Sequence, residues 1–187
     1  MPNQSSLARY GVVAQALHWI IAALIVTQFT LAWMADELPL GMQKLALLAR
    51  HKSFGMTVLM LAVLRLAWRL FNRPPPMPTA MRPTEKLLAK GMHGLLYGLL
   101  FAMPLTGWMM SSAKNYSVSW FGRFTWPDLI GKNEQMFELL KSTHHLLSWL
   151  LLTAAILHIG AALKHHFWDK DDVLTRMLPL TKPEKRT

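Results

Sequence analysis

Three long stretches of this chain contain no aspartate, glutamate, lysine or arginine. They cover residues 10–35, 91–113 and 142–163 and are 26, 23 and 22 residues long. About 20 apolar residues of helix cross the hydrocarbon core of a bilayer. Only 16% of the 187 residues are charged, whereas soluble domains average about 25%. The sequence therefore predicts an integral membrane protein and excludes a soluble enzyme.

A fourth hydrophobic stretch runs from His51 to Phe71 and carries charges only near its ends, at Lys52, Arg65 and Arg69. Long cationic side chains near a helix end can reach the headgroups. Only helices satisfy their own backbone in lipid without closing a barrel. We therefore expect an all-α, four-helix membrane bundle forming a single domain over residues 1–187. The expected spans are residues 10–35, 50–71, 88–112 and 142–166.

The three expected connections differ in composition. Residues 36–44 are short and polar, and residues 74–83 form a proline-rich linker that no helix can continue through. Residues 114–141 are the longest connection and contain Trp120, Phe121, Phe124 and Trp126. Such aromatic residues favour a loop that lies on the membrane interface.

The basic residues are divided unequally between the two sides of the expected bundle. The side with the chain termini has 13 of the 20 lysines and arginines, and the other side has seven, whereas the acidic residues divide five and five. By the positive-inside rule, both termini are expected in the cytoplasm. Topology thus accounts for the net charge of +10, and no nucleic-acid partner is expected.

The chain contains no cysteine. It therefore has no disulfide, no thiolate iron–sulfur cluster, no zinc finger and no covalent Cys-x-x-Cys-His haem attachment. Any cofactor must be held by nitrogen or oxygen atoms or by a methionine thioether, for which Met56 and Met60 are minor candidates.

Histidines occur at matched depths in different spans. His18 and His158 each lie about eight residues from the cytoplasmic end of a span, whereas His51 and His144 each begin a span at the opposite surface. His144 and His158 are 14 residues apart, so at ~100° per residue they share a helix face and lie ~21 Å apart along the axis. Ionisable groups inside a membrane are functional candidates. The sequence therefore predicts two histidine pairs, one near each membrane surface.

Two imidazoles from facing helices are the axial ligands of a b-type haem in a four-helix bundle. The pairs therefore predict two non-covalent haem b groups, one held by His18 and His158 and the other by His51 and His144. Buried histidines that only pack, and zinc or copper sites, remain alternatives. No acidic or sulfur ligand shares these depths.

Glycines near the histidines admit two interpretations. Gly55 follows His51 by one helical turn on the same face, and its missing side chain would let a porphyrin approach the backbone. Gly91, Gly94 and Gly98 form a small-residue strip on the third span, for which helix packing is favoured over haem contact.

These residues resemble the bacterial cytochrome b561 family over nearly the whole chain, with the third connection least alike. The matching segments are Leu17-His18-Trp19, His51 with Gly55, Leu64-Arg65-Leu66 through Arg69, His93 with Tyr97, Pro104 with Gly107, Leu140-Lys141-Ser142 before His144, and Leu157-His158. The last and most specific block is His165-His166-Phe167-Trp168, Lys170-Asp171, Leu174 and Arg176-Met177.

The resemblance implies a di-haem cytochrome of the bacterial inner membrane that oxidises superoxide at the periplasmic face and reduces ubiquinone, with the same four histidines as haem ligands. It also implies a quinone site near the cytoplasmic haem, at His93, His165 and Trp168. His165 lies about 20° from the helical phase of His158 and ~10 Å nearer the cytoplasm. An imidazole there can deliver protons, and Trp168 can stack on the quinone ring. The alternative is that His165 and His166 only reach the interface.

A cluster of cations on the periplasmic side could attract superoxide by electrostatic focusing, although the same side chains could instead anchor headgroups or neutralise haem propionates. They are Lys44, Arg50, Lys52, Lys114, Arg123 and Lys132. Two other functions remain open. One is an electron-carrier subunit that docks a dehydrogenase partner through the third connection, and the other is a haem-free metal or proton transporter. No role is assigned to His145, and oligomeric state has no signal in the sequence.

Overall fold

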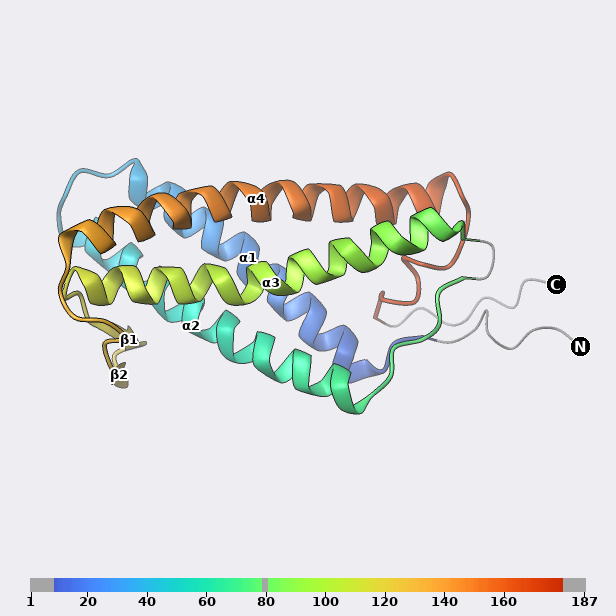
Figure 1. Cartoon of the computed structure of the whole chain (residues 1–187), viewed down its shortest axis with the longest axis horizontal. Coiled ribbons are helices and arrows are strands. Elements are labelled where there is room, and N and C mark those ends of the chain that lie inside the picture. Colours follow the sequence, from blue (N-terminus) through green and yellow to red (C-terminus); the bar gives the residue numbers. More distant parts are fainter. Residues whose placement is uncertain (1–8, 79–80, 180–187) are drawn as a thin grey trace, which may run out of the picture.

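The computed structural model describes residues 9–78 and 81–179. Within them the chain forms four long helices and one pair of short strands (Figure 1). These elements are α1 (Val12–Asp36), α2 (Met42–Phe71), α3 (Pro83–Ala113), β1 (Val118–Trp120), β2 (Phe124–Trp126) and α4 (Glu134–Phe167). All four helices are long and apolar enough to cross a bilayer. The prediction of an all-α four-span bundle is therefore confirmed.

The outer surface of the bundle is apolar. Val26, Trp149 and Ile156 are each more than 60% exposed and come from the middle of α1 and α4. Because lipid tails are as apolar as these side chains, their exposure on the outside of the bundle costs no free energy in a membrane.

Three of the helices begin earlier than hydropathy predicts: α2 at Met42 rather than residue 50, α3 at Pro83 rather than 88, and α4 at Glu134 rather than 142. Capping explains two of these starts. The Asn133 side chain accepts a hydrogen bond from the Met136 backbone N–H, 3.0 Å long. Proline at the first position of α3 is favourable because its missing N–H would have no intrahelical partner. Hydropathy finds the part of a helix that lies in lipid, whereas caps determine where the helix begins.

The helices do not pack equally against one another. α1 packs on α2, α3 packs on α4, and α2 contacts α3, but among the described residues no Cα atom of α4 lies within 8 Å of α1 or α2. Closely packed helices have axes about 8–10 Å apart, so α4 faces α1 and α2 across a wider separation. Side chains bridge part of it, since Ile25 and Phe29 of α1 pack against a cluster of Leu99, Leu151 and Ala154.

The two ends of the bundle are named here by what closes them. The hairpin end is where α1 and α3 finish and where β1 and β2 lie, and the terminal end is where α1 begins and α4 finishes (Figure 1). Of the cations counted on the terminal side, Lys182, Lys185 and Arg186 lie outside the described residues.

Part of the connection between α3 and α4, expected to be a loop on the membrane interface, is a β-hairpin. β1 and β2 pair antiparallel, with Trp120 opposite Phe124. The turn places Phe121 and Gly122 at positive φ, 49° and 71°, the conformation of a tight hairpin turn. The hairpin is fastened to α2, because the Ser53 hydroxyl accepts a hydrogen bond from the Phe121 N–H, 3.1 Å long.

A C-terminal strap, residues 169–178, closes the terminal end. Its centre is Arg176, only 6% exposed, which donates hydrogen bonds to the Asp172 carboxylate (3.0 Å) and to the Pro76 carbonyl (2.6 Å). The Arg176 carbonyl accepts a hydrogen bond from Gln15 Nε2 of α1, 3.0 Å long. One buried arginine therefore joins the strap, the proline-rich linker and the start of α1.

We expect Arg176→Ala to release the strap. Hydrogen bonds to a charged group contribute about 1.5–3 kcal/mol each, and the variant also leaves Asp172 without its partner. Hydrogen–deuterium exchange should become at least tenfold faster in peptides from residues 169–178. Arg123→Ala, which removes an exposed arginine from the hairpin turn, serves as the control. Unchanged exchange in the strap would contradict this account.

Candidate functional site

At the hairpin end, the structure brings His51 of α2 and His144 of α4 together. Their ring centres are 6.5 Å apart and the ring planes make an angle of 77°. An imidazole nitrogen lies about 1.1 Å from its ring centre and bonds a first-row metal at about 2.0 Å, so two imidazoles on opposite sides of one metal have centres about 6 Å apart. The spacing of this pair therefore fits a metal held between the rings.

Hydrogen bonds orient both rings of this pair. His51 Nδ1 lies 3.2 Å from the backbone carbonyl oxygen of Gln28, and His144 Nδ1 lies 3.0 Å from the Thr106 hydroxyl. The hydroxyl proton of Thr106 faces the Ala102 carbonyl at 2.8 Å, so the hydroxyl oxygen accepts from His144. With the proton on Nδ1, each Nε2 is left unprotonated and able to bind a metal.

Two glycines and one glutamine complete the surroundings of this pair. A Cβ added to Gly107 would lie 3.2 Å from Cε1 of His144, and one added to Gly55 would lie 2.9 Å from Nε2 of Gln28. The Gln28 side-chain oxygen is buried and has no hydrogen-bond partner among the described residues. Such orphaned polar atoms are rare in folded proteins. The two facing imidazoles, the missing side chain at Gly107 and the unpaired Gln28 oxygen together fit a group bound between the rings.

The glycine strip on α3 does not serve close helix packing. A Cβ added at Gly91, Gly94 or Gly98 would meet no atom of the described chain within 4 Å. The favoured packing interpretation of these three glycines is therefore not supported by the geometry.

We expect Gly107→Val to displace the His144 ring and to weaken binding of any group held between His51 and His144. The first added carbon already comes within 3.2 Å of the ring, and valine cannot rotate its branches away from it. Gly131→Val, in the connection before α4 and facing open space, is the control. The absorption spectrum of the purified chain should change for the first variant and not for the second. Identical spectra would contradict the assigned role of Gly107.

At the terminal end, three histidine rings gather. The ring centres of His18 on α1 and His158 on α4 are 6.3 Å apart, a spacing that again fits a metal between them. His93 of α3 lies closer to the same ring, at 5.5 Å from His158. The family resemblance implies that His93 belongs to a quinone site, and the structure places it directly beside the second histidine pair.

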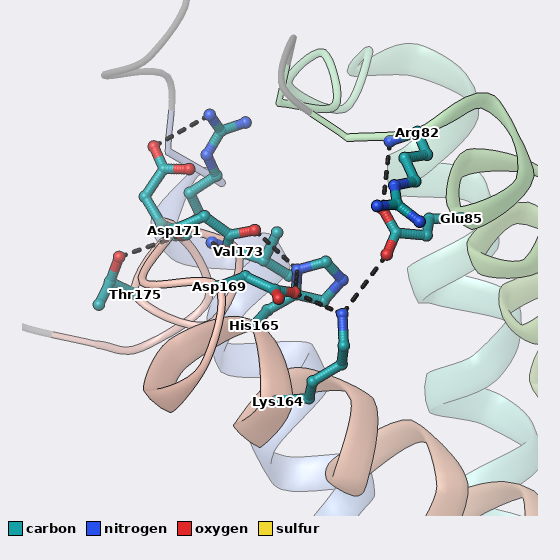
Figure 2. A network of polar contacts seen from close by, with 10 residues as sticks. Arg82, Glu85, Lys164, His165, Asp169, Asp171, Val173 and Thr175 are labelled. Carbon is teal, nitrogen blue, oxygen red and sulfur yellow. Dashed lines mark hydrogen bonds and ion pairs between the residues drawn. The ribbon is translucent and has the colours of Figure 1, made fainter.

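His165 lies further toward the terminal end, against two carboxylates (Figure 2). Its Nδ1 is 2.7 Å from the carboxylate of Asp171 and 3.1 Å from that of Asp169. Lys164 Nζ is 2.7 Å from Asp169 and 3.4 Å from Glu85 of α3. The hydrogen bond from Lys164 lowers the pKa of Asp169. This network ties the end of α4 to the start of α3.

The ligand atoms of His165, Asp169 and Asp171 lie within 4.8 Å of one another, but Lys164 already occupies the Asp169 carboxylate, which disfavours a metal there. Trp168 is 85% exposed. Among the described residues, no hydrogen bond, ion pair or ring contact joins His93, His165 and Trp168. The structure therefore brings His93 to the terminal histidine pair and His165 to the acidic network.

Three of the six cations expected to attract anions at the hairpin end have partners within the chain. Lys44 donates to the Leu38 carbonyl at 3.1 Å and Lys52 to the Ser117 carbonyl at 2.8 Å. Lys114 forms an ion pair with Glu134 at 2.6 Å, which joins α3 to α4. The hydrogen bond to Glu134 raises the pKa of Lys114.

Several supporting residues escaped the sequence analysis. Thr106 carried one usable signal, since it is a polar residue on α3 at the depth of His144. Gln28 acts on His51 through its backbone, which no side-chain pattern reveals. Asp169 and Asp171 follow the last span closely and could have been proposed as partners of His165.

Four apolar spanning helices with paired histidines near both ends define the class of membrane proteins that hold b-type haem between helices. The chain matches the family described as "Prokaryotic cytochrome b561" over residues 9–180, and it belongs to that family. The family implies haem b cofactors and a prokaryotic membrane location.

Known relatives extend over nearly the whole chain. It is 36% identical over 172 residues to "Cytochrome b561 homolog 2" of Escherichia coli K12, which covers 91% of both chains. It is 29% identical over 175 residues to "Probable superoxide oxidase CybB" of Yersinia pestis, covering 91% of this chain and 96% of the relative. A third relative is "Cytochrome b561 homolog 1" of Escherichia coli K12, 28% identical over 89% of this chain and 94% of its own length.

Proposed function

We propose that the chain is a di-haem cytochrome that oxidises superoxide at the hairpin end and reduces ubiquinone at the terminal end. The observation that carries this proposal is the presence of two histidine pairs, 6.5 Å and 6.3 Å between ring centres, near opposite ends of the bundle. In the overall reaction, two superoxide anions each lose one electron and leave as dioxygen. One ubiquinone gains two electrons and two protons and becomes ubiquinol.

The residues of the chain hold and orient the cofactors in this proposal. His51 and His144 bind one haem, and His18 and His158 bind the other. Haem b supplies one-electron redox chemistry when bound. The Gln28 carbonyl and the Thr106 hydroxyl keep the Nδ1 protons of the hairpin-end pair in place, so both Nε2 atoms would be free to hold a haem iron.

Protons for quinone reduction come from the terminal end. His165 is hydrogen-bonded to Asp171 and lies beside the exposed Asp169, so its imidazole is placed to take up protons from the aqueous side. An imidazole is suited to transfer protons near neutral pH. His93, at the ring of His158, supplies a second imidazole on the quinone side, and Trp168 offers an exposed ring for stacking.

Superoxide is favoured as the donor by the name of the Yersinia pestis relative, 29% identical over nearly its whole length, and by the charge of the hairpin end. Arg50, Arg123 and Lys132 are exposed at the hairpin end, and no ion pair joins them to a carboxylate among the described residues. A surface with unpaired cations raises the local concentration of a small anion.

A second candidate is an electron-carrier cytochrome b that links a dehydrogenase to the quinone pool. Two observations favour it. Lys44, Lys52 and Lys114 have partners within the chain and contribute less to attracting anions. The relative at 36% identity has a name that states no donor.

The haem assignment predicts two haems per chain in the detergent-purified protein, with a bis-imidazole b-type reduced-minus-oxidised spectrum. His144→Ala should retain one haem, because the terminal-end pair is intact, and His158→Ala should retain the other. His145→Ala, next to one ligand but exposed, should keep both. Two haems in either ligand variant would contradict the assignment of the histidine pairs as haem ligands. A colourless wild-type protein would favour the haem-free transporter.

Electrostatic attraction predicts that superoxide reduces the purified cytochrome more slowly as ionic strength rises, since salt screens exposed charges. Arg50→Gln combined with Arg123→Gln should lower the rate at low salt by about threefold to tenfold. Lys86→Gln combined with Lys90→Gln makes the same charge change at the opposite end and should leave the rate unchanged. A slow, salt-independent reaction in the wild-type chain would favour the electron-carrier function.

A further inference from the structure

A cavity of about 220 Å³ opens at the terminal end, between the start of α1, the end of α2 and Tyr97 of α3. Four of its lining residues are arginines, and no acidic residue lines it. They are Arg9, Arg65, Arg69 and Arg73. Neither histidine pair nor the His165 network contributes to this lining, so the cavity is a separate feature of the bundle.

The arginines of α2 and its C-terminal extension have no carboxylate partner. Among the described residues, no ion pair involves Arg65, Arg69 or Arg73. Arg65 donates to the Ala14 carbonyl of α1 at 3.0 Å, and the Arg69 guanidinium lies 5.5 Å from the centre of the Tyr97 ring. Each contact holds a guanidinium in place but uses only part of its N–H groups, so donors remain that can bind an anion.

The start of α1 adds a further positive charge to the cavity. Gly11 precedes the first residue of α1 and provides no side-chain cap, and both Gly11 and Ala14 line the cavity. The first N–H groups of a helix have no intrahelical partner, and the helix dipole favours an anion beside them. Arg65 and Arg69 belong to α2, whereas the free N–H groups belong to the start of α1. Both features favour an anion in the same cavity.

The surroundings of the cavity fit a lipid. Arg65 lies six residues before the end of α2, a depth of ~9 Å along the helix, and Trp68 and Tyr10 also line the cavity. Tryptophan and tyrosine are typical of the headgroup region. Leu70 and Phe71, at the end of the same helix, are 74% and 87% exposed and offer apolar surface to acyl chains.

We propose that this cavity binds the phosphate of an anionic phospholipid from the leaflet at the terminal end. Basic pockets between spanning helices are typical binding sites for anionic headgroups, and guanidinium groups bind phosphate oxygens through two parallel hydrogen bonds. The cavity extends past the end of α2 to Arg73 and Pro74. This position suits a headgroup at the interface better than a group held deep in the bundle beside His18.

The test uses the purified holoprotein, delipidated in detergent and then titrated with phosphatidylglycerol or cardiolipin. Native mass spectrometry should show at least one anionic lipid retained per chain, and phosphatidylcholine at the same concentration should not be retained. Arg69→Gln combined with Arg73→Gln should weaken this binding at least tenfold, because two of the phosphate-binding charges are lost. Lys86→Gln combined with Lys90→Gln, on α3 at the same end and outside the cavity lining, should bind as the wild type does.

Each other outcome overturns the proposal. Equal lipid binding by both double variants would show that surface charge alone attracts the lipid. If inorganic phosphate is retained by the chain as strongly as phosphatidylglycerol, the cavity binds a free anion and not a lipid. Loss of a bound haem in the Arg69→Gln, Arg73→Gln variant, measured by the pyridine haemochrome assay, would assign the arginines to haem propionates. The lipid result does not depend on superoxide or quinone activity.

Discussion

The separation of α4 from α1 and α2 determines much of the structure. α4 packs closely on α3 alone and meets the other two helices through side chains. Helices in lipid associate through packing and polar contacts rather than through a hydrophobic driving force, so a wide separation must be filled to be stable. Layers of side chains fill it. A histidine pair lies near each end, and between them Ile25 and Phe29 pack on Leu99, Leu151 and Ala154. A group held between each pair of rings would complete these layers and join α4 to the rest of the bundle.

The two ends of the bundle are closed by different contacts. At the hairpin end, hydrogen bonds fasten β1 and β2 to α2, including one from Trp120 Nε1 to the Thr57 hydroxyl, and the Lys114–Glu134 ion pair joins α3 to α4. At the terminal end, charged groups form the closure, with Arg176 in the strap and Lys164 between Asp169 and Glu85. Among the described residues, the contacts between a histidine and a carboxylate, those of His165 with Asp169 and Asp171, lie at the terminal end. This difference matches the proposed chemistry, in which quinone reduction consumes protons and superoxide oxidation does not.

The four spans and both histidine pairs could be predicted because each depends on a regular pattern. Charge-free length locates a span, and depth together with helical phase brings His144 and His158 to one face. The structure places these histidines beside His51 and His18, as that pattern requires. Features that depend on a few local contacts could not be predicted in this way. The hairpin turn needs Phe121 at positive φ, an unusual conformation for a bulky residue, and the orientation of His51 depends on a backbone carbonyl. The position of Arg176 depends on a fold-back of the chain end that leaves no periodic signal.

The positive-inside rule accounts for the number of cations at the terminal end but not for their arrangement. Arg65, Arg69 and Arg73 recur every four residues, which places Arg65 and Arg69 on one face of α2. Like charges at this spacing destabilise a helix by about 0.2–0.5 kcal/mol per pair. The negative end of the helix dipole offsets this cost for Arg69, which lies in the last turn, but its effect fades before Arg65. Arg65 is instead compensated by the Ala14 carbonyl and, in our proposal, by the phosphate it shares with Arg69. Orientation in the membrane would be satisfied by cations anywhere on this side and does not explain their convergence on one cavity without an acidic residue, whereas the anionic ligand that we propose does.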